Sequence, residues 1–469
     1  MSFMAKVKSF FGVQDMTQGK PMTGLVRFSV PLLIGNLAQQ LYNTVDSIVV
    51  GTYIGDTALA AVGTAGPIFN LLLVLLLGIS TGASILTAQY FGAQDRKNLS
   101  RVVGSTITLT VVSGLAMMVV GYFASPWLVS LVAPPADVAQ GATVYLQIIF
   151  IGMIGCAAYN IISGVLRGMG DSVSPLIYLI IASLLNIALD IWFVRDFGMG
   201  VAGVAWATIS AQAVSGALCL IRVCRMRDVV DVNRKTLIPH PRLTAKLCSL
   251  GMPAGITQAI FSMSAILVQS LTNSLGTAVI AANVAIMRVD GFAMLPNFTF
   301  GTAATTFVGQ NVGAHKGDRV RQGVKDLLRL ALICAGVLVA CILLFGHQLI
   351  GMFSSTEEVI EIGQRGLRWL SVGYIAFAVT QVLQGVMRGA GETMVPMWIS
   401  IIGTVALRLP LAYGLCWLTR SEAWPNGTPD AIFASLLIAW VLSMVMTVIA
   451  YRSGLWRRRL PESLREELK

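Results

Sequence analysis

The feature that most constrains this chain is a series of long apolar runs that repeats from about residue 25 almost to the end. Each run has about 20 or more residues, the length a helix needs to cross roughly 30 Å of hydrocarbon. These runs must be helical, because lipid offers no partner for open backbone groups. Twelve are predicted, at about 25–50, 58–86, 102–124, 143–166, 175–195, 202–224, 247–274, 279–308, 326–352, 367–388, 395–418 and 431–453.

The composition agrees with a membrane location. Hydrophobic residues make up 55% of the chain and charged residues only 12%, whereas a typical soluble domain is about 25% charged. This excludes a soluble enzyme, a disordered chain and a disulfide-rich secreted domain. Residues 1–24 are polar and lack the apolar core of a signal peptide, so no cleavage is expected. The fold class is therefore an all-α integral membrane protein.

The basic residues predict the orientation. Of the 33 Lys and Arg residues, 27 lie in the N-terminus, alternate loops and the tail, against four on the other side. By the positive-inside rule, both termini are cytoplasmic in a multi-pass protein of the plasma (inner) membrane. The net charge of +11 is then explained by topology, and no nucleic-acid partner is predicted. The basic stretch 456–459 is expected to rest against anionic lipid, a membrane-lipid contact.

The chain contains an internal repeat at a shift of about 221 residues. Residues 164–175 match 385–396, both with an Arg-Gly-x-Gly-acid core followed by Pro, and Pro31 matches Pro253 at a shift of 222. Six helices per half is an even number, so both halves insert the same way up. We therefore expect two six-helix bundles related by a pseudo-two-fold axis along the membrane normal, with a site between or within them.

The predicted domains follow from this repeat. They are a cytoplasmic N-terminal segment (1–24), an N-terminal six-helix bundle (25–224), a basic cytoplasmic linker (225–246), a C-terminal six-helix bundle (247–453) and a basic cytoplasmic tail (454–469).

Acidic residues within the first-half spans are the strongest functional signal. A carboxylate at mid-membrane costs roughly 2.5–3.5 kcal/mol on insertion scales and usually marks a pathway. Asp46 lies on the first span, and Asp190 lies one turn after Asn186 on the fifth. On the sixth span Thr208 begins a polar stripe. Carboxylates, an amide and a hydroxyl can hold a small cation, and two neighbouring carboxylates can share a proton; a position near the helix ends, in contact with interfacial water, is the alternative.

Further polar residues are candidates for a substrate cavity. Those of the first span that lead up to Asp46 are Asn36, Gln39, Tyr42 and Asn43. Pro31 removes a backbone hydrogen bond from the same helix and predicts a kink there, a candidate hinge.

The second half departs from the first at these positions. Val268 aligns with Asp46, so the seventh span has no acid there. The eighth span carries Arg288 and Asp290, which form either an internal salt bridge or a substrate contact. Arg408 on the eleventh span lines a cavity or pairs with an acid elsewhere. If the acids of the first half bind a cation, the halves are functionally unequal.

Other chemistries have weaker support. Neither a CxxC pair nor a mid-membrane histidine occurs, so no metal site is predicted. No P-loop is found, and neither an organic cofactor nor catalytic residues are predicted. Residues 168–171 spell GxGD, a motif of intramembrane aspartyl proteases, but the repeat copy reads GxGE and the neighbours fit a tight turn that needs Gly.

At these residues the chain resembles the MATE (multidrug and toxic compound extrusion) family. The resemblance covers about residues 20–455. The motifs that carry it are Gln40-Leu-Tyr-Asn-Thr-Val-Asp46, Arg167-Gly-Met-Gly-Asp171, Leu185-Asn186-Ile-Ala-Leu-Asp190 and Gly203-Val-Ala-Trp-Ala-Thr208. The prokaryotic branch with an Asp on helix 1 and Asn-x-x-x-Asp on helix 5 is the most similar. Branches with a glutamate on helix 7 match less well, which puts a sodium site in the second half in doubt.

The resemblance implies a secondary active antiporter and not an enzyme. It would export amphipathic, often cationic organic compounds in exchange for H⁺ or Na⁺, as a monomer. It also implies that Asp46, Asn186, Asp190 and Thr208 form the cation or proton site, with Tyr145 near it. The alternatives are a lipid-linked oligosaccharide flippase of the same superfamily and, more remotely, an intramembrane aspartyl protease.

Overall fold

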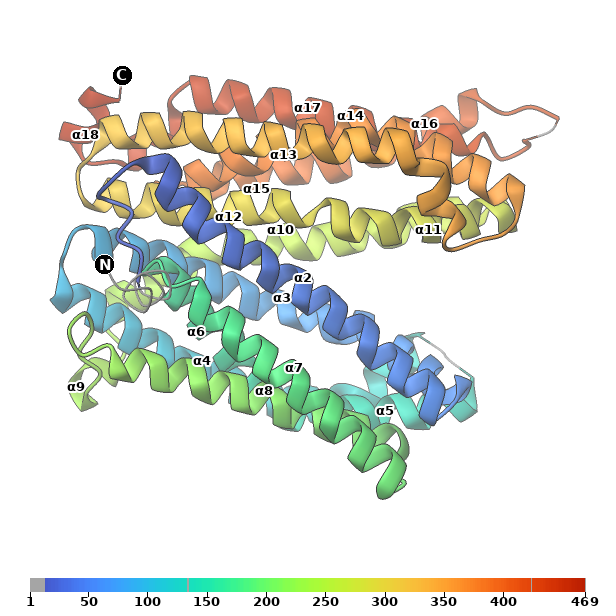
Figure 1. Cartoon of the computed structure of the whole chain (residues 1–469), viewed down its shortest axis with the longest axis horizontal. Coiled ribbons are helices and arrows are strands. Elements are labelled where there is room, and N and C mark those ends of the chain that lie inside the picture. Colours follow the sequence, from blue (N-terminus) through green and yellow to red (C-terminus); the bar gives the residue numbers. More distant parts are fainter. Residues whose placement is uncertain (1–12, 133–134, 423, 469) are drawn as a thin grey trace, which may run out of the picture. The chain divides into compact units, whose positions relative to one another are not determined.

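The structure is a computed structural model that describes residues 13–132, 135–422 and 424–468. Within the helices, the side chains of residues 43, 46–51, 56, 57, 59, 71, 75, 136 and 137 lie outside the description. The described residues are mostly helical: 86% of the chain is helix, and the described residues contain no strand (Figure 1).

The helices of the first half of the chain are α2 (Pro21–Tyr53), α3 (Asp56–Gly92), α4 (Arg96–Val132), α5 (Ala136–Ile151), α6 (Met153–Gly168), α7 (Val173–Ile191), the π-helix η1 (Trp192–Asp196) and α8 (Gly200–Arg225). A short helix, α9 (Arg234–Leu237), follows. Those of the second half are α10 (Pro241–Asn273), α11 (Thr277–Ala293), α12 (Leu295–Gly313), α13 (Gly317–Gly351), α14 (Glu357–Gly389), α15 (Met394–Ile401), the π-helix η2 (Ile402–Leu407), α16 (Arg408–Leu418) and α17 (Pro429–Arg452). The 3-10 helix η3 (Leu455–Arg459) and α18 (Glu462–Glu467) complete the tail.

Every predicted span falls on one helix or on two or three helices in direct succession. The predicted span 143–166 is two helices, α5 and α6, bent by 57°. The break lies at Gly152, where a Cβ atom would stand only 2.2 Å from the Cβ of Ile209 on α8. The close approach of α8 explains why a residue without a side chain is needed there.

Among the described residues, ten helices are long and apolar enough to cross a membrane, or eleven if α5 and α6 form one span. This confirms a multi-pass, all-helical membrane protein. The remaining predicted span is covered by α2, which has 33 residues. A total of twelve stays a prediction.

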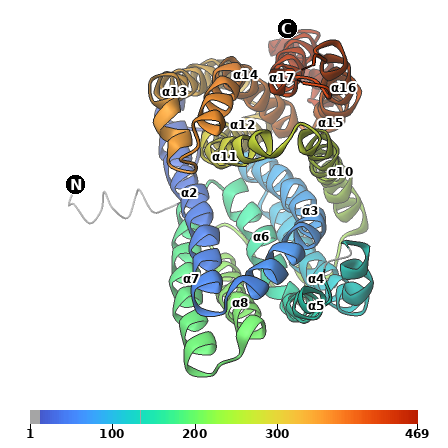
Figure 2. The same ribbon diagram turned by 90° about the vertical axis from the view of Figure 1, so that its right-hand side faces the viewer.

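The chain divides into two compact units. Unit 1 comprises residues 1–16 and 26–255, and unit 2 comprises residues 17–25 and 256–469. The division therefore falls inside α2 and inside α10, two residues after Pro253. The predicted domains place the linker at 225–246 instead, where the structure has α9 packed against α4. Figure 2 shows the same helices in a second view, turned by 90° about the vertical axis.

The matching turns of the two repeats have the predicted glycine geometry. Gly170 has φ 86° and Gly391 has φ 92°, both in the region that favours glycine. The acid that follows each glycine caps the next helix: Asp171 accepts from the backbone N–H of Ser174, and Glu392 accepts from that of Met394. The GxGD sequence is thus explained by a capped turn.

Each capping acid also holds an arginine from another part of its own unit. Asp171 pairs with Arg222 of α8 at 3.1 Å. Glu392 pairs with Arg459 of η3 at 3.2 Å, so the basic tail is attached to protein. Trp456 is only 1% exposed and stacks on Tyr451. The expectation that this stretch rests on lipid is therefore wrong for Trp456, which is buried within unit 2, and stays a prediction for the arginines that follow it.

The contact between α3 and the first half of α10, both in unit 1, leaves no room for side chains. A Cβ atom at Gly82 would lie 2.2 Å from the backbone oxygen of Leu247. Backbone cannot move as a flexible side chain can, so Gly82→Ala is expected to destabilise the protein by about 1–3 kcal/mol. The measurement is the midpoint of thermal unfolding of the purified protein.

Gly63→Ala, in the same helix α3, is the matched control. No described atom lies within 4 Å of a Cβ at this position, and alanine favours helix over glycine by about 1 kcal/mol. We expect an unchanged or higher midpoint for it. Equal midpoints for the two variants would contradict the close-contact interpretation.

Candidate functional site

Of the two candidate acids of the first half, Asp46 and Asp190, the structure describes the side chain of Asp190, which lies in the interior of unit 1. Asp190 and Asn186 are both 0% exposed on α7. They are four residues apart, so they share one face of the helix. α7 packs along α8, which carries Thr208 and Gln212, again one turn apart. Four polar side chains thus occupy two neighbouring helices in an apolar surrounding.

Several of these buried atoms have no hydrogen-bond partner within the described part of the chain. They are both amide atoms of Asn186, the hydroxyl oxygen of Thr208 and the amide oxygen of Gln212. A buried polar group without a partner costs roughly 1–3 kcal/mol. Buried oxygen atoms without a protein partner, on the helix of Asp190 and on its neighbour, are groups that a small cation or bound water could satisfy.

The polar stretch of α2 lies partly beside α7. A Cβ at Gly35 would stand 3.7 Å from the side chain of Leu176 on α7. Asn36, Gln39 and Tyr42 are half-buried. The side chains of Asn43 and Asp46 lie outside the described residues, so the meeting of Asp46 with Asp190 stays a prediction. Pro31 is buried within α2, and its role as a hinge is likewise a prediction.

Tyr145 is placed by α5, which packs against both α3 and α8. Its side chain is 9% exposed and belongs to the apolar core of unit 1. The structure therefore puts Tyr145 on a helix that contacts the helix of Thr208. It does not by itself assign Tyr145 to the cation site.

The expected salt bridge between Arg288 and Asp290 is wrong. Residues two apart on a helix point in nearly opposite directions, and Arg288 is exposed. Asp290 instead accepts a hydrogen bond from the hydroxyl of Tyr374 on α14, and its electrostatic neighbour is Arg408. The bond between Asp290 and Tyr374 joins α11 and α14, and the sequence does not reveal it because the two residues are 84 positions apart.

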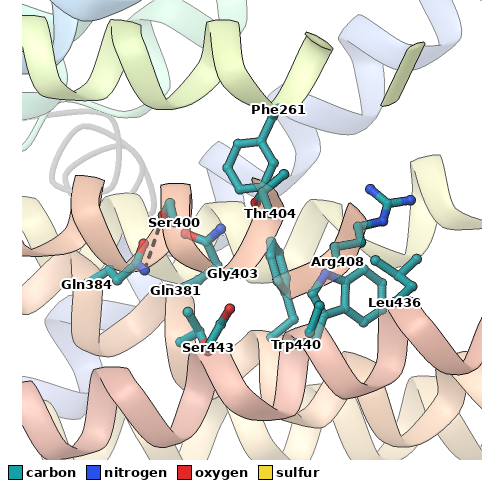
Figure 3. Close-up of a pocket in the computed structure, with 13 residues that line it drawn as sticks. Phe261, Gln381, Gln384, Ser400, Gly403, Thr404, Arg408, Leu436, Trp440 and Ser443 are labelled. Atoms are coloured by element: carbon teal, nitrogen blue, oxygen red, sulfur yellow. Dashed lines mark hydrogen bonds between the residues drawn. The ribbon is translucent and has the colours of Figure 1, made fainter. Parts of the chain in front are cut away.

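Unit 2 contains a pocket that the sequence did not reveal (Figure 3). It is lined by Phe261, Phe377, Thr380, Gln381, Gln384, Ser400, Gly403, Thr404, Arg408, Leu436, Ala439, Trp440 and Ser443. Its cavity volume, counted as the space open to the centres of water molecules, is about 40 Å³. Since one water needs roughly 10–15 Å³ on this measure, the enclosed part holds a few water molecules or one small ligand group.

The π-helix η2 shapes this pocket. It contributes Gly403 and Thr404 to the lining, and Arg408 follows directly after it. One extra residue per turn widens the helix locally, and such segments are frequent at functional sites. The only signal for this site in the sequence was Arg408, an arginine inside an apolar span; the amide and hydroxyl residues around it resemble ordinary polar residues of buried helices.

The MatE family model matches the chain twice, over residues 31–192 and 253–414. The two matches have equal length and are 222 residues apart, in agreement with the internal repeat. The chain belongs to the MATE family. The two copies begin at Pro31 and Pro253.

Relatives and solved structures extend over nearly the whole MATE chain. The probable multidrug resistance protein YoeA of Bacillus subtilis is 30% identical and covers 92% of this chain and 93% of its own. The probable multidrug resistance protein NorM of Thermotoga maritima is 27% identical, with 93% of each chain covered. A crystal structure of MATE in the bent conformation, 23% identical, has a TM-score of 0.88 over 97% of this chain and 98% of the other.

Family membership decides the class of activity. MATE proteins are membrane transporters, so this chain is a transporter and not an enzyme. The alternative of an intramembrane aspartyl protease is thereby overturned.

Proposed function

We propose that this MATE transporter is a secondary active multidrug antiporter of the plasma (inner) membrane. It exports amphipathic, often cationic organic compounds in exchange for H⁺ or Na⁺. Relatives named as multidrug resistance proteins support export of such compounds. The coupling site is assigned to Asp46, Asn186, Asp190 and Thr208, and the protein acts as a monomer with both termini in the cytoplasm.

The observation that carries the proposal is the group of unpartnered atoms on α7 and α8. The Asn186 oxygen is buried one turn from Asp190 on α7, and the buried Thr208 oxygen belongs to the neighbouring helix α8, within unit 1. A cation that enters there gains oxygen ligands and reduces the buried negative charge. Loss of that charge changes the relative free energies of the conformations of the surrounding helices. A bend of α2 near Pro31 would then change the shape of the substrate cavity predicted along α2.

The driving force is adequate for efflux without ATP. When one coupling cation is exchanged for an uncharged compound, one elementary charge moves inward, and across 100 mV this releases about 2.3 kcal/mol. At about 1.4 kcal/mol per decade, this corresponds to roughly fortyfold accumulation of substrate on the far side. Exchange of one coupling cation for one singly charged cationic compound moves no net charge and is driven by the concentration gradient of the coupling ion.

The test is transport of a cationic dye, ethidium, by the protein in proteoliposomes or in inverted vesicles, where export is seen as dye uptake into the lumen. The proton and sodium gradients are collapsed separately, the first with a protonophore and the second with a sodium ionophore. We expect dye movement to stop when one of the two gradients is removed. Dye movement that persists when both gradients are collapsed, or that requires ATP, would contradict the antiport mechanism.

A further inference from the structure

Arg408 carries a positive charge that the described side chains do not neutralise closely. Its Nε atom is buried and has no hydrogen-bond partner among the described residues. Asp290 is its electrostatic neighbour, yet no Arg408–Asp290 ion pair within 4.0 Å is found in the described part of the chain. Asp290 is instead engaged by the hydroxyl of Tyr374.

The pocket beside Arg408 has the character of an anion site. None of its 13 lining residues is acidic. Gln381, Thr404 and Ser443 offer amide or hydroxyl groups, and Arg408 provides the charge. An arginine within a membrane-spanning helix is energetically costly, and such residues usually mark functional sites. The guanidinium group is well suited to bind carboxylates.

The internal repeat gives Arg408 a particular position. At the shift of 222 residues that relates the two family matches, Arg408 corresponds to Asn186 of the candidate cation site. The turn prolines Pro175 and Pro396 are 221 residues apart, whereas the ends of the two family matches, 192 and 414, are 222 apart. Between the turn and the end of the match, the second copy therefore has one residue more than the first. The π-helix η2 lies in that interval and accommodates such an insertion. The same place in the two halves thus holds groups that favour opposite charges.

We propose that the pocket of unit 2 binds the carboxylate of an aromatic acid, with Arg408 as its counter-charge. This inference deepens the proposed function and rests on it, since it names a second substrate class, aromatic carboxylates, for the same transporter. The second half is then an anion-selective partner of a cation-selective first half.

The walls of the pocket favour an aromatic ligand. Figure 3 shows Phe261 above and Trp440 below the region next to Arg408, with Gln381, Gln384 and Ser400 at the other end. Trp440 also contacts Phe377, with ring centroids 5.5 Å apart. Aromatic rings pack well against such faces. The small enclosed volume has room for the carboxylate group alone, so the ring of the ligand would lie outside it, against Phe261 and Trp440.

The experiment is equilibrium binding to the full-length transporter in lipid nanodiscs, without any ion gradient. Three probes of similar shape are compared: benzoate, neutral benzamide and cationic benzylammonium. We expect saturable benzoate binding at least tenfold tighter than that of the other two. Arg408→Gln should weaken benzoate binding about tenfold or more, and Arg408→Lys should weaken it less.

The matched control is Arg365→Gln, which removes one positive charge from the same unit. Arg365 is exposed on α14 and pairs at 3.5 Å with the half-buried Asp430, and neither residue lines the pocket. Its benzoate affinity should equal that of the wild type. Size-exclusion profiles and thermal midpoints show which variants fold; if Arg408→Gln does not, Arg408→Lys and the three-probe comparison on the wild type decide.

Three results would overturn the proposal. They are benzamide or benzylammonium binding as tight as that of benzoate, unchanged benzoate affinity in folded Arg408→Gln, and chloride competition as strong as that of benzoate, which would mean that the ring contributes nothing. Ethidium efflux is measured on the same preparation. Loss of benzoate selectivity with intact gradient-driven efflux defeats only this inference, whereas intact selectivity without gradient-driven efflux defeats only the proposed antiport.

Discussion

Asp190→Asn is expected to abolish gradient-coupled efflux while the protein still folds. Asparagine has nearly the same shape as aspartate but carries no charge. The site can therefore no longer alternate between an ionised form and a protonated or cation-bound form. Ethidium efflux in vesicles should fall about tenfold or more. The folded state should be retained, because removing a buried charge lowers the cost of burial.

Asp196→Asn is the matched control for this substitution. Asp196 is an exposed acid on η1, six residues further along the same helical segment. It undergoes the same chemical change outside the buried cluster, and its efflux should stay at the wild-type rate. Wild-type drug resistance in an Asp46→Asn, Asp190→Asn double variant would rule out the assigned coupling site.

Tyr374→Phe is expected to destabilise unit 2 by about 1.5–3 kcal/mol, the range for a hydrogen bond to a charged group. Tyr374 is fully buried on α14 and donates its hydroxyl hydrogen to Asp290. Phenylalanine keeps the ring contact with Trp440 but leaves the carboxylate without this donor. The measurement is the midpoint of unfolding, followed by intrinsic fluorescence of the purified protein.

The control for the hydroxyl is Tyr413→Phe. Tyr413 is 49% exposed on α16, so loss of its hydroxyl should have little effect. As a second comparison, Tyr374→Phe should destabilise an Asp290→Asn background less than it destabilises the wild type, because the hydroxyl then no longer serves a charged partner. Equal stability of Tyr374→Phe and wild type would show that the bond makes no net contribution.

Much of the fold could be predicted because helices in lipid must satisfy their own backbone groups. Apolar run lengths therefore placed the spans on helices, and the duplicated turn at Gly170 and Gly391 had the expected positive φ. The bend at Gly152 was missed. It arises from contact with Ile209 on α8, a residue more than 50 positions away, and no local pattern encodes that approach.

The candidate sites divide in the same way. Asn186 and Asp190 could be singled out because polar groups in a long apolar run are costly wherever the run folds, and a spacing of four puts them on one helix face. The partner of Asp290 could not be predicted: Arg288 was nearer in sequence, but helix geometry turns it away and brings Tyr374 from another helix.

The sequence alone determined the membrane class, the repeat and the buried acid of α7, because each follows from local chemistry: the solvent a residue must face, the spacing along one helix or the identity of a turn residue. Only the tertiary structure decided which atoms stay unpartnered beside Asp190, that the tail covers Trp456, and that Arg408 faces a pocket without acids. These depend on which distant helices pack together, and packing is a property of the whole set of side chains.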